Sequence, residues 1–136
     1  MTEASRGYKF HISETALSEL RDLRRRDPDS FDTVIVMIQE IRSDLRACEQ
    51  LVDEHFADET IRMVEEFRAA QAEGLNAYTV KLYELEAWRL ITAGDHRARV
   101  IAIMSVMHRS RDYQTDQTLM KQLRRDYDAL GFTRLS

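Results

Sequence analysis

Three basic side chains stand on three successive segments that have the pattern of β-strands. Lys81 lies in "YTVKLYEL", Arg89 lies in "AWRLIT", and Arg109 directly follows "RVIAIMSVMH". Side chains of a strand point alternately to the two faces of a sheet, so Lys81 is expected on the face opposite Val80 and Leu82. The same rule applies to Arg89. Three cations on one open sheet face would form an anion site that can hold a phosphate while it gains charge in a transition state.

The end of the last of these segments adds three candidates to the site. His108, Arg111 and Tyr113 follow the apolar run of residues 100–107 within a few positions. Such a site needs no metal ion if a side chain takes the proton from the attacking hydroxyl. The alternative is that Arg89 and Arg109 form ordinary surface ion pairs, and their partners would then be Glu84, Glu86 or Asp112.

Metal and thiol chemistry find little support in the residue pattern. The four histidines lie in different predicted elements without an HxxxH or HxH pair, so neither a metal site nor a cofactor is predicted. Cys48 is the single cysteine. It lies on the apolar stripe of a predicted helix, which indicates a core position. The sequence holds no phosphate-binding glycine loop and no GxSxG motif.

The composition is that of an ordinary globular chain from a reducing cytoplasm. With 136 residues, 43% hydrophobic and 32% charged, it predicts one domain over residues 1–136. One cysteine excludes an internal disulfide, and the opening "MTEASRGYKF" lacks an apolar signal-peptide core. The longest apolar run, eight residues over 100–107, is too short to span a bilayer.

Charge is distributed unevenly along the chain. The net charge of −4 argues against a protein that coats nucleic acid nonspecifically. Residues 31–77 carry eleven acidic against four basic residues, whereas residues 78–136 carry ten basic against seven acidic. We interpret the acidic middle as solvated helix faces, with docking of a basic partner as the alternative. We interpret the arginines of "RDLRRRD", residues 21–27, as solvated charges that complement the negative end of a helix dipole. The alternative is a patch that binds nucleic acid.

Hydrophobic periodicity and capping residues predict a strand, two or three helices, three strands and a final helix, in that order. Ser13 is expected to cap the first helix, and Pro28 ends it. The spacing of Ile61, Val64 and Phe67 predicts a third helix within residues 52–76. We therefore expect an α+β fold whose mostly antiparallel sheet joins the N-terminal strand to a C-terminal three-strand meander, with helices packed on one face.

The order and the residues together resemble the RelE/ParE superfamily of bacterial toxins from type II toxin–antitoxin modules. The matching segments cover most of the chain; they are "YKFHI", "SETALSELRDL", "YTVKLYEL", "WRLITAGD" and "VIAIMSVMHRSRDY". Residues 52–76 look like a helical insertion relative to the compact family core. Some ribonuclease members carry a second lysine on the strand of Lys81, and Thr79 occupies that position here.

For ribonuclease members such as RelE, the resemblance implies metal-independent cleavage of mRNA in the ribosomal decoding site. There the ribose 2′-OH attacks the adjacent phosphate, and basic side chains on the concave sheet face assist. A C-terminal tyrosine of the family stacks on the base or orients the nucleophile. The residues that correspond to the catalytic set are Lys81, Arg89, Arg109 and Tyr113, and those expected to contact RNA or phosphate are Arg111 and His108.

The resemblance also implies a partner, a cognate antitoxin that covers the cationic face. Two other functions stay open beside the endoribonuclease. One is a ParE-like inhibitor of DNA gyrase or replication that does not cut RNA, whose helical half would carry the contact. The other is a non-toxic phage or mobile-element protein that has kept the scaffold for protein interaction.

Overall fold

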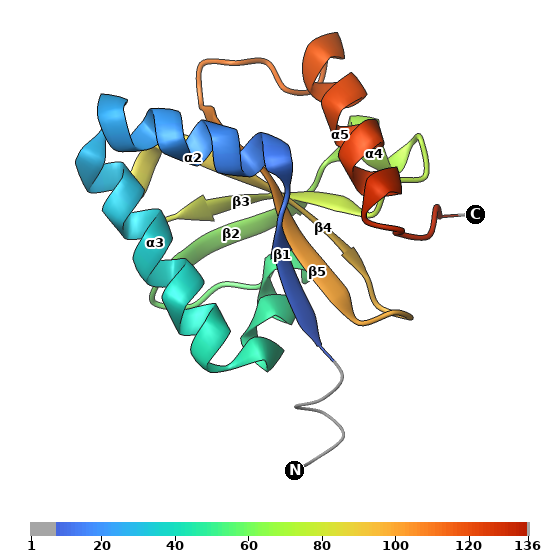
Figure 1. Ribbon diagram of the computed structural model, residues 1–136, viewed down its shortest axis with the longest axis horizontal. Coiled ribbons are helices and arrows are strands. Elements are labelled where there is room, and N and C mark those ends of the chain that lie inside the picture. Colours follow the sequence, from blue (N-terminus) through green and yellow to red (C-terminus); the bar gives the residue numbers. More distant parts are fainter. Residues whose placement is uncertain (1–7, 136) are drawn as a thin grey trace.

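An open five-stranded sheet forms the centre of the molecule, with helices packed around it (Figure 1). The computed structural model describes residues 8–135, so the domain predicted over 1–136 extends past the described residues at both ends. The strands lie in the order β1-β5-β4-β3-β2, and β1 is parallel to β5 while the other neighbours are antiparallel. The predicted α+β class is confirmed, and the sheet is mixed. In chain order the elements are β1 (Lys9–Ile12), α2 (Glu14–Arg26), α3 (Pro28–Ser43), the 3-10 helix η1 (Leu45–Val52), β2 (Ile61–Glu66), α4 (Arg68–Gln71), β3 (Ala77–Leu82), β4 (Leu85–Asp95), β5 (Val100–His108) and α5 (Gln117–Ala129).

The first two helices begin at capping residues. Ser13 Oγ accepts a hydrogen bond from the Ala16 N–H at 3.1 Å and begins α2. Asp27 accepts from the Ser30 N–H at 3.3 Å, and Pro28 opens α3 behind it. The helical spacing of Ile38, Ile41, Leu45, Cys48 and Val52 predicts a second helix that continues to residue 52. This prediction is wrong in its second half, because α3 ends at Ser43 and η1 follows.

The helical insertion predicted over residues 52–76 is also wrong. The segment contains the edge strand β2 and the one-turn helix α4. Ile61 and Val64 are three residues apart and both are buried in the same cluster, which in a regular strand would be impossible. The register of β2 against β3 shifts between Ile61 and Met63. This bulge resets the alternation, so a strand imitates the spacing of a helix.

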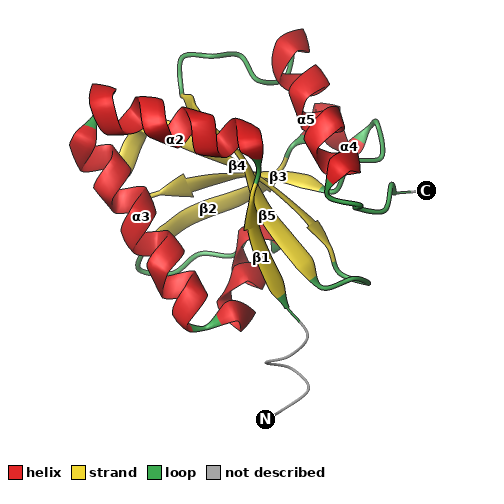
Figure 2. Ribbon diagram, viewed as in Figure 1, coloured by secondary structure: helices red, strands yellow, loops and turns green. Residues whose placement is uncertain are grey.

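Helices cover both faces of the sheet, so the expectation of helices on one face is wrong (Figure 2). We call the face that packs against α2, α3 and η1 the α2/α3 face; Val80, Leu90 and Ile103 belong to it. We call the opposite face, which packs against α4 and α5, the α5 face; Ile91 and Met104 belong to it. The apolar run of β5 is buried throughout because its side chains fill both clusters.

Helix α2 closes the part of β5 that β1 leaves open. The strand β1 pairs only with residues 100–103 of β5. Beyond that point Ser13 Oγ donates to the Met104 carbonyl at 2.9 Å. Glu19 Oε1 accepts from Ser105 Oγ at 2.8 Å and from the Val106 N–H at 3.0 Å. The side chains of Ser13 and Glu19 therefore make the hydrogen bonds to the β5 backbone that a neighbouring strand would otherwise make.

Candidate functional site

Two of the predicted cations, Lys81 and Arg89, lie on one face of the sheet, and Arg109 directly follows the end of the neighbouring strand β5. Arg89 pairs with Met107, which is buried in the cluster of the α5 face. Arg109 follows Met107 by two residues, and its N–H donates to the Ala87 carbonyl at 2.8 Å, which extends the ladder past β5. Alternation from Val80 places Lys81 on the same face. We call Lys81, Arg89 and Arg109 the cationic row.

The cationic row is not engaged in the ion pairs of the described residues. Within residues 8–135, none of its members makes an ion pair. Arg89 Nη1 reaches only the Glu86 carbonyl, at 3.5 Å. Lys81 and Arg89 are half-buried and Arg109 is exposed. The surface ion pairs that we considered as an alternative are therefore not formed, and the row is free to bind an anion.

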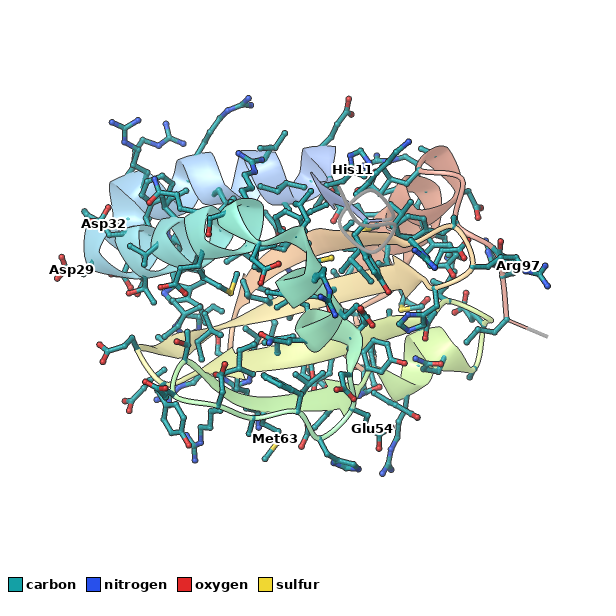
Figure 3. The ribbon with its side chains drawn as sticks, turned by 90° about the horizontal axis from the view of Figure 1, so that it is seen from below. His11, Asp29, Asp32, Glu54, Met63 and Arg97 are labelled. Atoms are coloured by element: carbon teal, nitrogen blue, oxygen red, sulfur yellow. The ribbon has the colours of Figure 1, made fainter. Side chains whose placement is uncertain are left out.

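Strand β2 adds two residues beside the row that the sequence reading missed. Met63 pairs with Lys81 and Glu65 pairs with Thr79 on the neighbouring strand β3. Figure 3 shows Met63 at the β2 edge of the sheet, the edge farthest from α2. Glu65 lies diagonally across from Lys81, a separation of about 7–8 Å between backbones that long side chains can bridge. A carboxylate thus stands next to the cations.

Tyr113 lies near this carboxylate, on the α5 face. Its ring packs edge-to-face on Phe67 with centroids 5.2 Å apart, and it belongs to the periphery of the α5-face cluster. Together with Glu65 it lines an open hollow of about 570 Å³. The loop of residues 109–116, which carries Tyr113, runs from the end of β5 to α5 (Figure 2).

The hollow is lined mainly by acidic side chains. Glu54, Glu65 and Glu66 line it, with Arg68 as a basic member. A hydrogen bond with Glu54, followed by the charge of that carboxylate, raises the pKa of Glu66. His55 Nε2 lies 2.8 Å from Glu54 Oε1. Anions are therefore disfavoured at the β2 edge, while the row attracts them.

His108 and Arg111 do not join the cationic row. His108 pairs with Trp88 across the strands, and the two rings meet edge-to-face at 5.2 Å on the α2/α3 face. Arg111 forms an ion pair with Asp116, with Nη2 and Oδ2 2.5 Å apart. The N–H of Leu119 and the Arg111 guanidinium together lower the pKa of Asp116, which caps α5. The sheet thus divides the six predicted residues into two sets.

Other reactive groups lie apart from both sets. Burial raises the pKa of the Cys48 thiol to about 11, as expected for a core cysteine. Within the described part of the chain, no three His, Cys, Asp or Glu side chains gather closely enough to hold a metal ion. None of the helices described above is long and apolar enough to cross a membrane.

Comparison with family models, with curated proteins and with solved structures finds no match for this chain. The resemblance to the RelE/ParE superfamily therefore stays a prediction from the sequence. The site itself consists of three cations without ion-pair partners among the described residues, beside one carboxylate and one tyrosine.

Proposed function

We propose that the protein is the toxin of a type II toxin–antitoxin pair and acts as a metal-independent, ribosome-dependent mRNA endoribonuclease. The observation that carries the proposal is the cationic row. Lys81 and Arg89 lie on adjacent strands, Arg109 follows the end of the next strand, and none of the three has an ion-pair partner among residues 8–135. Such a row suits a phosphodiester, because its charge grows from one to two as the phosphorus gains a fifth oxygen.

The reaction that fits these residues is transfer of the phosphate to the neighbouring 2′-oxygen. The 2′-oxygen bonds to phosphorus, the bond from phosphorus to the 5′-oxygen breaks, and the products are a 2′,3′-cyclic phosphate and a 5′-hydroxyl. Arginine stays protonated in proteins and cannot accept the proton of the 2′-hydroxyl. We assign that role to the Glu65 carboxylate, and Lys81 gives a proton to the leaving 5′-oxygen.

The remaining members of the site hold the substrate. Arg89 and Arg109 carry the phosphate oxygens, with planar guanidinium groups that can donate two parallel hydrogen bonds each. Tyr113, at the wall of the adjoining hollow, offers a ring on which the base next to the cut can stack. A cognate antitoxin would inhibit the enzyme by covering the row.

Loss of an arginine from the row tests the proposal. Removal of one donor that stabilises a transition-state charge costs about 10²–10³ in rate, so we expect Arg89→Ala and Arg109→Ala each to abolish growth arrest and cleavage of mRNA on purified ribosomes. The matched control is Arg97→Ala, at the opposite end of the β4–β5 hairpin (Figure 3). The side chain of Arg97 is exposed, so we expect this variant to fold and act as the wild type does.

The two other candidate functions give different results in the same cells. A gyrase inhibitor would induce the DNA-damage response without loss of mRNA, and its toxicity would survive Arg89→Ala. A non-toxic interaction protein would leave growth unchanged when the wild type is expressed. Normal toxicity of both row variants, with folding intact by circular dichroism, would refute the nuclease proposal.

A further inference from the structure

A second cleft lies on the α2/α3 face, beside the same strand end that carries the cationic row. Its volume is about 160 Å³, and it opens between α2 and the ends of β4 and β5. The polar and aromatic residues that line it are Glu19, Asp22, Arg26, Trp88, His108 and Arg111. His108 lines the cleft and Arg109, a member of the row, is the next residue in the chain, so the cleft and the row meet at the end of β5.

His108 presents a free hydrogen-bond donor in this cleft. The Ser110 N–H donates to His108 Nδ1 at 3.2 Å. An N–H cannot accept, so Nδ1 is the acceptor, and the neutral ring carries its proton on Nε2. Nε2 bonds to no other residue in the part of the chain that the structure describes.

Glu19 presents a free acceptor. Its Oε1 is held by Ser105 Oγ and by the Val106 N–H, while Oε2 accepts no hydrogen bond from residues 8–135. Burial raises the pKa of this carboxyl even though both of those bonds act in the opposite direction. Burial of a carboxylate is costly when only one of its oxygens accepts hydrogen bonds. A ligand that donates to the second oxygen would therefore stabilise it.

Arg26 presents a flat platform. Its guanidinium carbon lies 5.5 Å above the centroid of the Trp88 ring, and no acid pairs with it among the described residues. The Trp88 indole is fixed in turn by a hydrogen bond from Nε1 to Asp27 Oδ2 at 2.9 Å. A guanidinium at cation–π distance from an indole on one side can stack on another planar group with the other.

We propose that this cleft binds an unpaired guanine of the RNA strand, next to the phosphate held by the cationic row. The ring of the base stacks on Arg26. Its N1–H and N2–H groups both donate to the free oxygen Oε2 of Glu19, and O6 or N7 accepts from His108 Nε2. This inference rests on the proposed function, because the strand that reaches the cleft is the one whose phosphate lies at Arg109.

The arrangement of donors and acceptors selects guanine over the other bases. Guanine is the base whose Watson–Crick edge places two neighbouring donors beside an acceptor. Adenine offers one donor on that edge beside the unprotonated N1, which would face the Glu19 carboxylate. Cytosine likewise turns N3 toward it, and uracil flanks its single N–H with two carbonyls. Single-stranded RNA is commonly read in this way, by stacking on arginine planes and by hydrogen bonds to the Watson–Crick edge.

Trp88 makes the cleft directly observable, because it is the single tryptophan of the chain. We expect GMP to change the tryptophan fluorescence of the intact protein with an affinity about tenfold or more above that of AMP, CMP or UMP. Inosine monophosphate differs from GMP only in lacking the N2 amino group, so it should bind more weakly than GMP. Equal responses to GMP and AMP, or no response to any nucleotide, would overturn the proposal.

Two variants of helix α2 separate recognition from structure. Glu19→Gln keeps an acceptor for Ser105 and Val106 but replaces the free carboxylate oxygen by an NH₂ group, so GMP should bind about tenfold more weakly or worse. Glu14→Gln, an exposed change on the same helix, should leave GMP binding unchanged. Thermal unfolding checks that both variants fold. If Glu19→Gln folds and binds GMP as tightly as wild type, the assignment is wrong.

Cleavage mapping distinguishes failure of this inference from failure of the proposed function. Wild type should cut mRNA at positions next to guanine, and Glu19→Gln should lose that preference. Arg89→Ala should lose cleavage and keep the fluorescence response to GMP. Cleavage without a guanine preference and without a GMP response would refute guanine binding in the cleft but not the nuclease activity. A GMP response in a protein that cuts no RNA would refute the nuclease activity but not guanine binding.

Discussion

Thr79 has a buried hydroxyl without a partner, and its removal should stabilise the protein. The residue is 1% exposed, and Oγ1 finds no hydrogen bond within the described residues. Leaving such a group unpaired costs about 1–3 kcal/mol. Thr79→Val keeps the shape and the preference for a strand while it replaces the hydroxyl by a methyl group, which adds about 0.8 kcal/mol of apolar burial. We expect a gain of about 1–3 kcal/mol in the free energy of unfolding.

Thr92 supplies a matched control in the same sheet. It is equally buried, at 0% exposure, but its Oγ1 donates to the Leu51 carbonyl at 2.6 Å. Thr92→Val removes that bond and orphans the carbonyl, so it should cost about 1–3 kcal/mol. The same substitution on two strands is thus expected to have opposite signs.

Urea unfolding of the two variants measures the difference. The midpoint should rise for Thr79→Val and fall for Thr92→Val with the slope unchanged, and the melting temperature should move by about 3–5 °C for each kcal/mol. A Thr79→Val protein that loses as much stability as Thr92→Val would refute the reasoning, since its hydroxyl would then have a partner. Because a side chain this deeply buried cannot touch RNA, we expect cleavage by Thr79→Val to equal that of wild type.

Two further stability measurements test the packing and the cleft. A Cβ at Gly94 would lie 2.7 Å from Ile101 Cδ1 and 3.3 Å from Val52 Cγ2, and both neighbours are buried, so Gly94→Ala should cost about 1–3 kcal/mol in urea unfolding. The raised pKa of Glu19 means that the folded protein binds its proton more tightly than the unfolded chain does. The resulting gain in the free energy of unfolding is complete below the pKa that Glu19 has in the unfolded chain. It is lost as the pH rises through the pKa that Glu19 has in the folded protein. The unfolding free energy of wild type relative to Glu19→Gln should therefore fall as the pH rises above about 4.3, the ordinary pKa of Glu, and a constant difference would contradict it.

Local patterns predicted the parts of the fold that depend on neighbours in the chain. Ser13 begins α2 as a cap should, since the bond to the Ala16 N–H spans three residues. Strand alternation likewise placed Lys81 and Arg89 on one face, because the rule follows from the geometry of a single strand. Neither inference required knowledge of what packs on the sheet.

The predictions that failed depend on contacts made far along the chain. A bulge between Ile61 and Met63 exists because β2 must pair with β3, and no local signal marks it. The missed strand also hid Glu65. Arg111 was predicted to contact phosphate, but its ion pair with Asp116 depends on how the loop returns to α5. His108 is different, because the alternation rule applied to β5 would have separated it from Arg109.

The acidic net charge and an RNA substrate are compatible once the charges are placed in space. The carboxylates of Glu54 and Glu66 line the hollow at the β2 edge, where they disfavour further phosphates. Arg24, Arg25 and Arg26 lie in the last turn of α2, on the other side of the β5 end. In the proposed complex, these charges favour a path for the RNA strand from the row around the end of β5 toward α2, which is the path that leads to the cleft.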